Sequence, residues 1–298
     1  MLLLLLLFLS MFQTVSRTPC TWTQAREAGA LENAVNESSG MAISRRIPNR
    51  SYRINDSGDS GRFFAIDLAG GGTKIVRIQG FNPADTEDMA LGPCSASVDC
   101  IFIGDIGDNL RQRQFLELII VEERADFPAE VAATYRVRMR YPDGPHDAEG
   151  LGVHPDGTIY ITTKDSKQLQ IYRLKREQWR NSRNRVEVLE LVVTQDWTVL
   201  RPNTLPWAYQ ITAMDIAPDG KSFVLLNYVD AVEFFVNLSA GSLDPANWKV
   251  GRDYRAIALT TLEQEEAIAY LPDGRSLLYD TERLSKTKTA RIMRMDCR

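Results

Sequence analysis

The segment Glu149-Gly-Leu-Gly-Val-His-Pro-Asp-Gly157 joins a strand pattern to a turn signal. Its first residue carries a side-chain oxygen, the next apolar residues alternate as in a half-buried strand, and Pro-Asp-Gly then favours a tight turn. Four further segments align with it without gaps, and they start at Ser39, Glu87, Thr212 and Glu266. The starts are 48, 62, 63 and 54 residues apart, and this spacing indicates a repeat architecture.

Further apolar or alternating runs follow each opening segment. Second runs cover 51–54, 100–103, 158–162, 221–226 and 275–279, and third runs cover 62–68, 115–121, 169–174, 232–236 and 290–295. Fourth runs cover 74–78, 134–140, 186–193 and 254–259. The fifth unit has no fourth run of its own, so we expect residues 21–32, at the other end of the chain, to supply that strand.

These runs predict an all-β fold, a β-propeller of five four-stranded blades whose ring is closed by the N- and C-terminal strands. Six blades are the alternative, because the two longest intervals leave room for extra strands around 197–207. A β-sandwich would explain short strands but not five openings that align without gaps.

The composition is that of an ordinary globular protein. The chain has 298 residues, of which 44% are hydrophobic and 25% charged, and this excludes disordered, collagen-like and coiled-coil proteins. Lys+Arg number 35 against 39 Asp+Glu, a net charge of −4, so no basic surface is expected to bind nucleic acid. No linker interrupts the repeats, so residues 17–298 are expected to form one domain and a monomer.

The first residues predict export. Residues 2–12 form an apolar run about half as long as the ~20 residues that cross a bilayer. We interpret residues 1–16 as a signal peptide rather than a membrane span, which places the mature protein in the periplasm or outside the cell.

The four cysteines fit an oxidising compartment. Cys94 and Cys100 flank a short turn, and pairing Cys20 with Cys297 would join the two ends of the mature chain. Four reduced thiols remain the alternative, since spacing alone does not fix connectivity.

The first residues of the five segments are candidate metal ligands. In a propeller the innermost strands begin at the central channel, so we expect Ser39, Glu87, Glu149, Thr212 and Glu266 to converge there. Three carboxylates in a narrow channel repel one another unless a cation or protons neutralise them. Oxygen ligands without Cys or His favour Ca²⁺. A water-filled polar channel without an ion is the alternative.

The ends of the second strands should return to the same mouth of the channel. From these ends and the adjoining loops we select Asp56, Asp105, Asn109, His146 and Lys164 as candidate catalytic residues. Turn chemistry alone also explains acidic loops, because Asp, Asn and Gly favour turns. In the same scheme His154 opens a turn on the opposite face, where we expect it to be exposed.

Several strings resemble a group of exported bacterial β-propeller proteins of largely unknown function. They include NDSGDS at 55–60 and GDIGDN at 104–109, and the similarity spans residues 36–282. The order of segment openings is also similar to that of the calcium-activated nucleotidases (apyrases), which are five-bladed propellers with one central Ca²⁺. That resemblance implies a Ser, Glu, Glu, Ser, Glu ligand series on the five residues above, with Thr212 replacing one Ser. The nucleotide-contacting residues do not carry over, so the resemblance does not imply nucleotide hydrolysis.

Two functions fit these observations. One is a Ca²⁺-dependent hydrolase of a small phosphoester or lactone, in which Asp56 or Asp105 activates water and Lys164 or His146 stabilises charge. The other is a non-catalytic propeller that binds a ligand or protein and holds a structural Ca²⁺. In both, the partner binds at the mouth of the channel.

Overall fold

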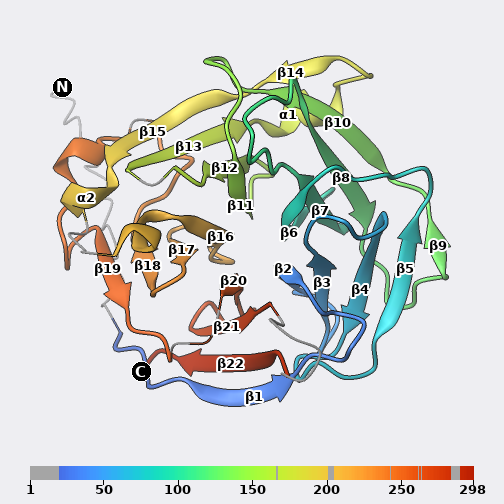
Figure 1. Ribbon diagram of the computed structural model, residues 1–298, viewed down its shortest axis with the longest axis horizontal. Helices are drawn as coiled ribbons and strands as arrows, with labels where there is room; N and C mark the ends of the chain where they lie inside the picture. The colour runs from blue at the N-terminus through green and yellow to red at the C-terminus, as the bar shows by residue number, and fades with distance from the viewer. Residues whose placement is uncertain are drawn as a thin grey trace, which may run out of the picture.

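Five β-sheets surround a central channel in the computed structural model (Figure 1). The structure describes residues 20–165, 167–200, 205–241, 243–260, 262, 264–282 and 289–298. The predicted five-bladed β-propeller is therefore confirmed.

Each blade runs from an inner strand at the channel to an outer strand at the rim. Blade 1 contains β2 (Ser38–Ile43), β3 (Ser51–Asn55), β4 (Arg62–Ile66) and β5 (Lys74–Ile78). Blade 2 contains β6 (Thr86–Pro93), β7 (Asp99–Asp105), β8 (Leu116–Glu122) and β10 (Tyr135–Arg140). Blade 3 contains β11 (Ala148–Val153), β12 (Ile159–Thr163), β13 (Gln168–Leu174) and β15 (Glu190–Asp196). Blade 4 contains β16 (Ile211–Ile216), β17 (Phe223–Asn227), β18 (Ala231–Phe234) and β19 (Tyr254–Ile257). Blade 5 contains β20 (Glu265–Tyr270), β21 (Ser276–Thr281), β22 (Arg291–Asp296) and β1 (Arg26–Ala30).

The N-terminal strand closes the ring as predicted. β1 pairs antiparallel with β22 and forms the outer strand of blade 5. Both expected disulfides are present, Cys20–Cys297 beside this junction and Cys94–Cys100 across the turn between β6 and β7. The backbones also pair at the ends of the chain, where Thr21 N donates to Arg298 O at 2.8 Å.

A second closure lies deeper between blades 1 and 5. Arg53 of β3 donates through Nε to Asp280 Oδ2 of β21 at 2.9 Å, and both side chains are fully buried. Ser38 Oγ donates to the other oxygen of Asp280 at 3.0 Å. Removing one partner of such a pair would leave a buried charge uncompensated, so this contact fixes how the last blade meets the first.

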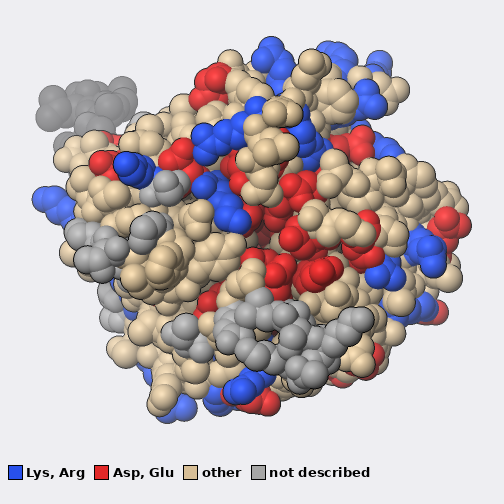
Figure 2. All heavy atoms as spheres, in the orientation of Figure 1, with Lys and Arg blue, Asp and Glu red and all other residues tan. Residues whose placement is uncertain are grey.

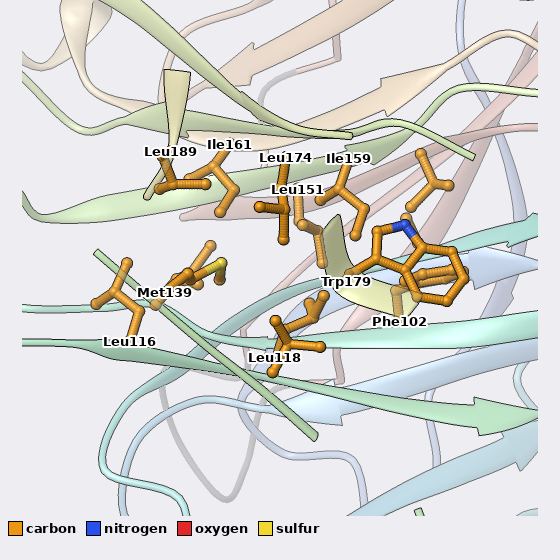
Figure 3. Close-up of a cluster of buried hydrophobic side chains, with 14 of the residues drawn as sticks. Phe102, Leu116, Leu118, Met139, Leu151, Ile159, Ile161, Leu174, Trp179 and Leu189 are labelled. Carbon is orange, nitrogen blue, oxygen red and sulfur yellow. The ribbon is translucent and has the colours of Figure 1, made fainter. Parts of the chain in front are cut away.

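Apolar side chains fill the spaces between the blades. The cluster between blades 2 and 3 includes Phe102, Leu118, Leu151 and Ile161 (Figure 3). Trp179 of the short helix α1 (Arg176–Arg180) completes it, with its ring edge-on to Phe102 at 5.6 Å and Nε1 donating to Gly157 O at 2.8 Å. Fully burying such a side chain stabilises the fold by about 1.5–3 kcal/mol.

The structure differs from three predictions made from the sequence. The fourth run of blade 3 is divided at Leu189, because β14 (Val186–Val188) leaves to pair with β10 of blade 2. The described part of 197–207 forms no sixth blade but the short helices α2 (Trp197–Leu200) and η1 (Pro206–Tyr209), since Trp197 packs into the core beside blade 4. His154 is buried and not exposed as expected. Its ring contacts Gly220 O on one side and the Asp156 carboxylate on the other.

Candidate functional site

The five predicted ligand positions share one backbone feature. In each blade the register between inner and second strand shifts by one residue, and the residue left without a partner is Ser39, Glu87, Glu149, Thr212 or Glu266. Such β-bulges re-aim a side chain and are frequent next to active sites. Five equivalent bulges at the same end of the inner strands present five oxygen-bearing side chains to one mouth of the channel.

Each of the two hydroxyl groups donates a hydrogen bond to a backbone carbonyl of the next blade. Ser39 Oγ donates to Glu87 O of the next blade at 2.7 Å, and Thr212 Oγ1 donates to Glu265 O of the next blade at 2.8 Å. Because each hydroxyl oxygen keeps its lone pairs when its O–H donates a hydrogen bond, both oxygens can still accept a hydrogen bond or bind a cation. The same bonds tie neighbouring inner strands together.

Three carboxylates converge beside blade 2. Single oxygen atoms of Asp56, Asp85 and Glu87 lie within 4.8 Å of one another, and the side chain of Asp85 hydrogen-bonds to that of Glu87. The backbone of Gly107 lies so close that a Cβ there would overlap both Glu87 and Asp85. Any larger residue at this position would therefore displace the two carboxylates.

Blades 3, 4 and 5 contribute a chain of contacts across the mouth. Lys164 forms an ion pair with Glu149, and its Nζ donates to Tyr228 Oη at 3.0 Å. Tyr228 in turn donates to Glu266 Oε1 at 3.2 Å. Gln264 extends the contact by donating to Glu282 Oε2 at 2.9 Å. Figure 2 shows the resulting concentration of acidic side chains at the centre of this face.

The acidic groups hold protons more tightly than isolated carboxyls do. Burial, followed by repulsion from Asp56 and Asp147, raises the pKa of Asp85 to about 6. Burial and repulsion from Glu282 and Glu149 raise the pKa of Glu266 to about 9. Burial and repulsion also hold the pKa of Glu87 well above its ordinary value. Burial and mutual repulsion thus keep part of these carboxyls protonated when no cation is bound.

Asp105 is fully engaged in hydrogen bonds and ion pairing. Its carboxylate accepts from Asp85 N at 2.7 Å and from Ala84 N at 3.2 Å, and it pairs with Arg113 Nη1 at 3.1 Å. Arg113 also donates to Gly107 O at 2.7 Å. We therefore interpret Asp105 as a positioning residue that holds the loop carrying Asp85, and not as the general base expected from the sequence.

The remaining predicted residues differ in placement. Asp56 lies in the acidic cluster, and Lys164 lies between Glu149 and Tyr228. His146 instead packs beside Tyr141 and pairs with Asp143 at 3.1 Å, and Tyr172 Oη lies 3.1 Å from its Nε2. Asn109 is exposed in the turn after β7. Only two of the five residues thus lie directly among the carboxylates of the mouth.

Sequence reasoning did not select three residues that shape the site. Asp85 belongs to the loop that enters β6, which the sequence places at the same mouth, but it is not among the residues predicted to be catalytic. Tyr228 and Glu282 follow the second strands of blades 4 and 5, where Lys164 follows that of blade 3. Their shared place at strand ends was the signal, but their contacts depend on packing between blades.

A second pair of acids lies farther along the inner strands. Asp88 Oδ2 accepts from Leu151 N at 2.8 Å and from Met214 N at 3.1 Å, and Asp88 is buried. Asp215 Oδ2 accepts from Tyr270 N of blade 5 at 2.7 Å. Burial raises the pKa of Asp88, while these backbone donors oppose the change. These two carboxylates therefore link neighbouring inner strands, because each accepts hydrogen bonds from backbone N–H groups of other blades.

Comparisons with known proteins add little to these observations. No protein-family model matches the sequence, and no curated protein does either. A solved structure titled "Streptogramin B lyase structure" is similar over 93% of this chain and 98% of its own, with 10% identity and a TM-score of 0.45. The likeness carries no argument about activity and does not specifically support the nucleotidase resemblance. The strand topology itself establishes the propeller.

Proposed function

We propose that this chain is an exported β-propeller that binds one Ca²⁺ at the mouth of its channel and hydrolyses a small phosphoester or lactone there. The observation that carries the proposal is the set of five equivalent bulges, each with an oxygen-bearing side chain. Among the described residues, no backbone N–H donates to the carboxylates of Glu87, Glu149 or Glu266. Without such donors, a cation is the partner that the charge and chemistry of these groups favour.

The donor set fits calcium. Three carboxylates and two hydroxyl groups are hard oxygen ligands, which suit Ca²⁺ better than Zn²⁺ or copper. Ser39 and Thr212 already direct their protons to backbone carbonyls, so their oxygens are available as ligands. When bound, the ion would neutralise the carboxylates and polarise an oxygen of the substrate.

The side chains around the mouth would supply proton transfer, anion binding and positioning. Asp56 and Asp85 would orient water and accept its proton, because they lie beside Glu87 and reach partial solvent exposure. Lys164 would bind an anionic oxygen of the substrate. Asp105 and Arg113 would keep the Asp85 loop in place.

A non-catalytic propeller with a structural Ca²⁺ is the second candidate. It is favoured by the engagement of Asp105 and Lys164, two residues expected to perform chemistry, in hydrogen bonds and ion pairs within the protein. In that case the ion would hold the blades together, and the acidic face would bind a ligand unchanged.

Export is supported indirectly. The two disulfides are compatible with an oxidising compartment, and no helix among the described residues is long and apolar enough to cross a membrane. The predicted signal peptide at residues 1–16 lies outside the described residues.

The deciding experiment combines metal analysis with an activity screen. Purified protein should retain one equivalent of calcium, lose it to EGTA, and turn over a phosphoester or lactone only when calcium is present. Glu87→Gln should lose the metal, and Asp85→Asn should lose turnover but remain folded. Asp126→Asn is the matched control, because Asp126 carries the same charge but is exposed and pairs with Lys74 away from the channel.

Each outcome bears on one candidate. Protein that binds calcium through Glu87 but turns over none of the esters supports the binding propeller. Protein that holds no calcium, and whose melting temperature ignores both calcium and EGTA, contradicts both.

A further inference from the structure

The outer edges of four blades are covered by a segment of the neighbouring blade. β9 (Glu130–Val131) of blade 2 pairs in parallel with β5 of blade 1, and β14 of blade 3 pairs in parallel with β10 of blade 2. Figure 1 shows both short strands outside the edges they cover. The helix η2 (Pro245–Asn247) of blade 4 contacts β15 of blade 3. Blade 1 covers blade 5, because Ala30 N of β1 donates to Ala69 O at 3.0 Å.

All four covering segments have the same origin. Each lies in the connection between the third and the outer strand of its own blade. An outer edge with unpaired backbone groups is a template for pairing with another chain, and natural propellers protect such edges. In each of these blades, the connection between the third and the outer strand therefore covers the outer edge of the neighbouring blade.

Blade 4 is the exception. By the same rule, its outer strand β19 should be covered by the segment between β22 and β1 of blade 5, but these two strands come from opposite ends of the described chain. Instead of a continuous connection, residues 20–25 run from the Cys20–Cys297 disulfide to β1. On the outer side of β19, the described residues pair only at Tyr254, which bridges to Val250 and accepts from Gly251 N at 2.8 Å; no strand of another blade pairs there.

The unpaired backbone groups of β19 can be assigned from its register. Phe235 N donates to Asp253 O at 2.7 Å, and Glu233 lies opposite Arg255, so the odd-numbered residues bond to β18. Because backbone groups alternate in an antiparallel pair, N–H and C=O of Ala256 point away from β18. Ala256 and Ala258 are exposed and small, so neither charge nor bulk guards this edge.

A groove of about 490 Å³ lies between this edge and the N-terminal segment. Its lining is mixed, with apolar side chains such as Trp22, Leu259 and Met295 beside polar ones such as Thr23 and Gln24. Arg255 fixes one end, because it forms an ion pair with Glu233 at 2.6 Å and donates to the carbonyl oxygen of Cys20. The groove is thus held between two anchored walls.

We propose that β19 binds an extended segment of a partner polypeptide, which adds to blade 4 as a parallel fifth strand in this groove. The segment would exchange backbone hydrogen bonds with Ala256 and would place apolar side chains against Trp22 and Leu259. The proposal rests on β9 and β14, which occupy the equivalent edges as short parallel strands. A second copy of this chain would present β19 antiparallel across a two-fold axis, so the internal precedent favours a peptide.

The test uses a phage-displayed library of linear peptides selected against the full protein. Peptides with alternating apolar residues should be enriched, and their synthetic versions should bind the wild type. Ala256→Pro should weaken binding at least about tenfold, because it removes the outward N–H and leaves the bonds to β18 intact. Ala256→Ser keeps the N–H and a small side chain, so it should bind like the wild type.

Folding is checked independently by the melting temperature of each variant. If Ala256→Pro unfolds, Ala258→Pro, which lies beyond the end of β19, replaces it with the same expectation. Peptides that bind Ala256→Pro as well as they bind Ala256→Ser overturn the proposal. A library without enriched sequences overturns it as well. Self-association of the wild type that Ala256→Pro abolishes also overturns it, in favour of a second copy.

Discussion

The channel carries acidic side chains at two levels, and the residues that donate hydrogen bonds to them differ between the levels. Asp88 and Asp215 accept N–H groups from neighbouring blades. Glu87, directly before Asp88 in the chain, instead faces Asp85 and Asp56. The difference shows that charge alone does not define a binding site, because the deeper carboxylates accept backbone N–H groups of neighbouring blades, whereas the partners of Glu87, Glu149 and Glu266 are side chains.

The bulges explain how adjacent residues reach such different surroundings. At Glu87 the extra residue turns its side chain to the mouth, and regular pairing resumes at Asp88. Asp88 is thereby directed to the backbones of β11 and β16. One residue of register separates a group that locks blades together from a group available to a ligand.

The largest expected effect separates these two neighbours in metal-free protein. Asp88→Ala should lower the free energy of unfolding by about 3 kcal/mol or more, because it leaves buried N–H groups of Leu151 and Met214 without an acceptor. Glu87→Ala should cost much less, since it also removes repulsion. Urea unfolding in EGTA measures both, and equal losses would contradict the distinction between the two levels.

Calcium should stabilise the mouth. At a free concentration about 100 times the dissociation constant, a ligand that binds only the folded state adds about 2.7 kcal/mol. We expect this gain in the wild type and in Asp126→Asn, and its absence in Glu149→Gln. Thermal unfolding with calcium and with EGTA measures it. A gain that survives in Glu149→Gln would show that the ion binds elsewhere.

The metal-free protein should become less stable as pH rises from about 4 to 9, with Asp85 contributing up to about pH 6 and Glu266 up to about pH 9. The pKa values of Asp85 and Glu266 are raised to about 6 and about 9, so the folded state holds protons that the unfolded state has released. Stability is therefore highest at low pH within this window and falls by about 1.4 kcal/mol per pH unit for each extra proton. Saturating calcium should flatten the slope. Urea unfolding across this pH range tests the sign, and a rising slope would contradict it.

The smallest effect concerns Lys164. Lys164→Gln removes a cation that competes for Glu149, so calcium affinity should rise about fivefold, as expected for a partly screened charge. In EGTA the same variant should be less stable, because Glu149 loses its partner. Calcium titration calorimetry provides the affinity. Weaker calcium binding would indicate that Lys164 positions a ligand instead of competing with the ion.

Much of this organisation could be predicted from the sequence, because period-two patterns and Pro-Asp-Gly turns act locally. They gave the blades, the closing strand and the five positions that turn out to be bulges. The partners of Asp105 and Lys164 could not be predicted, since they depend on how loops from different blades meet. The residues around Trp197 left a sixth blade open as an alternative, because a helix that packs into the core is as apolar as a strand. Asp88 has no sequence signal that distinguishes it from Glu87.

The meeting of the two chain ends has a topological consequence. Thr21 and Arg298 already exchange backbone hydrogen bonds, at 2.8 and 3.0 Å, so a short linker could join the ends without moving a blade. The circular chain could then be opened elsewhere, for example in the connection that contains β9. Such a permuted protein would keep every blade, but β5 would lose its cover, so its edge would be open in addition to that of β19. The site of chain opening, not the blade sequence, would then decide which further blade offers its edge.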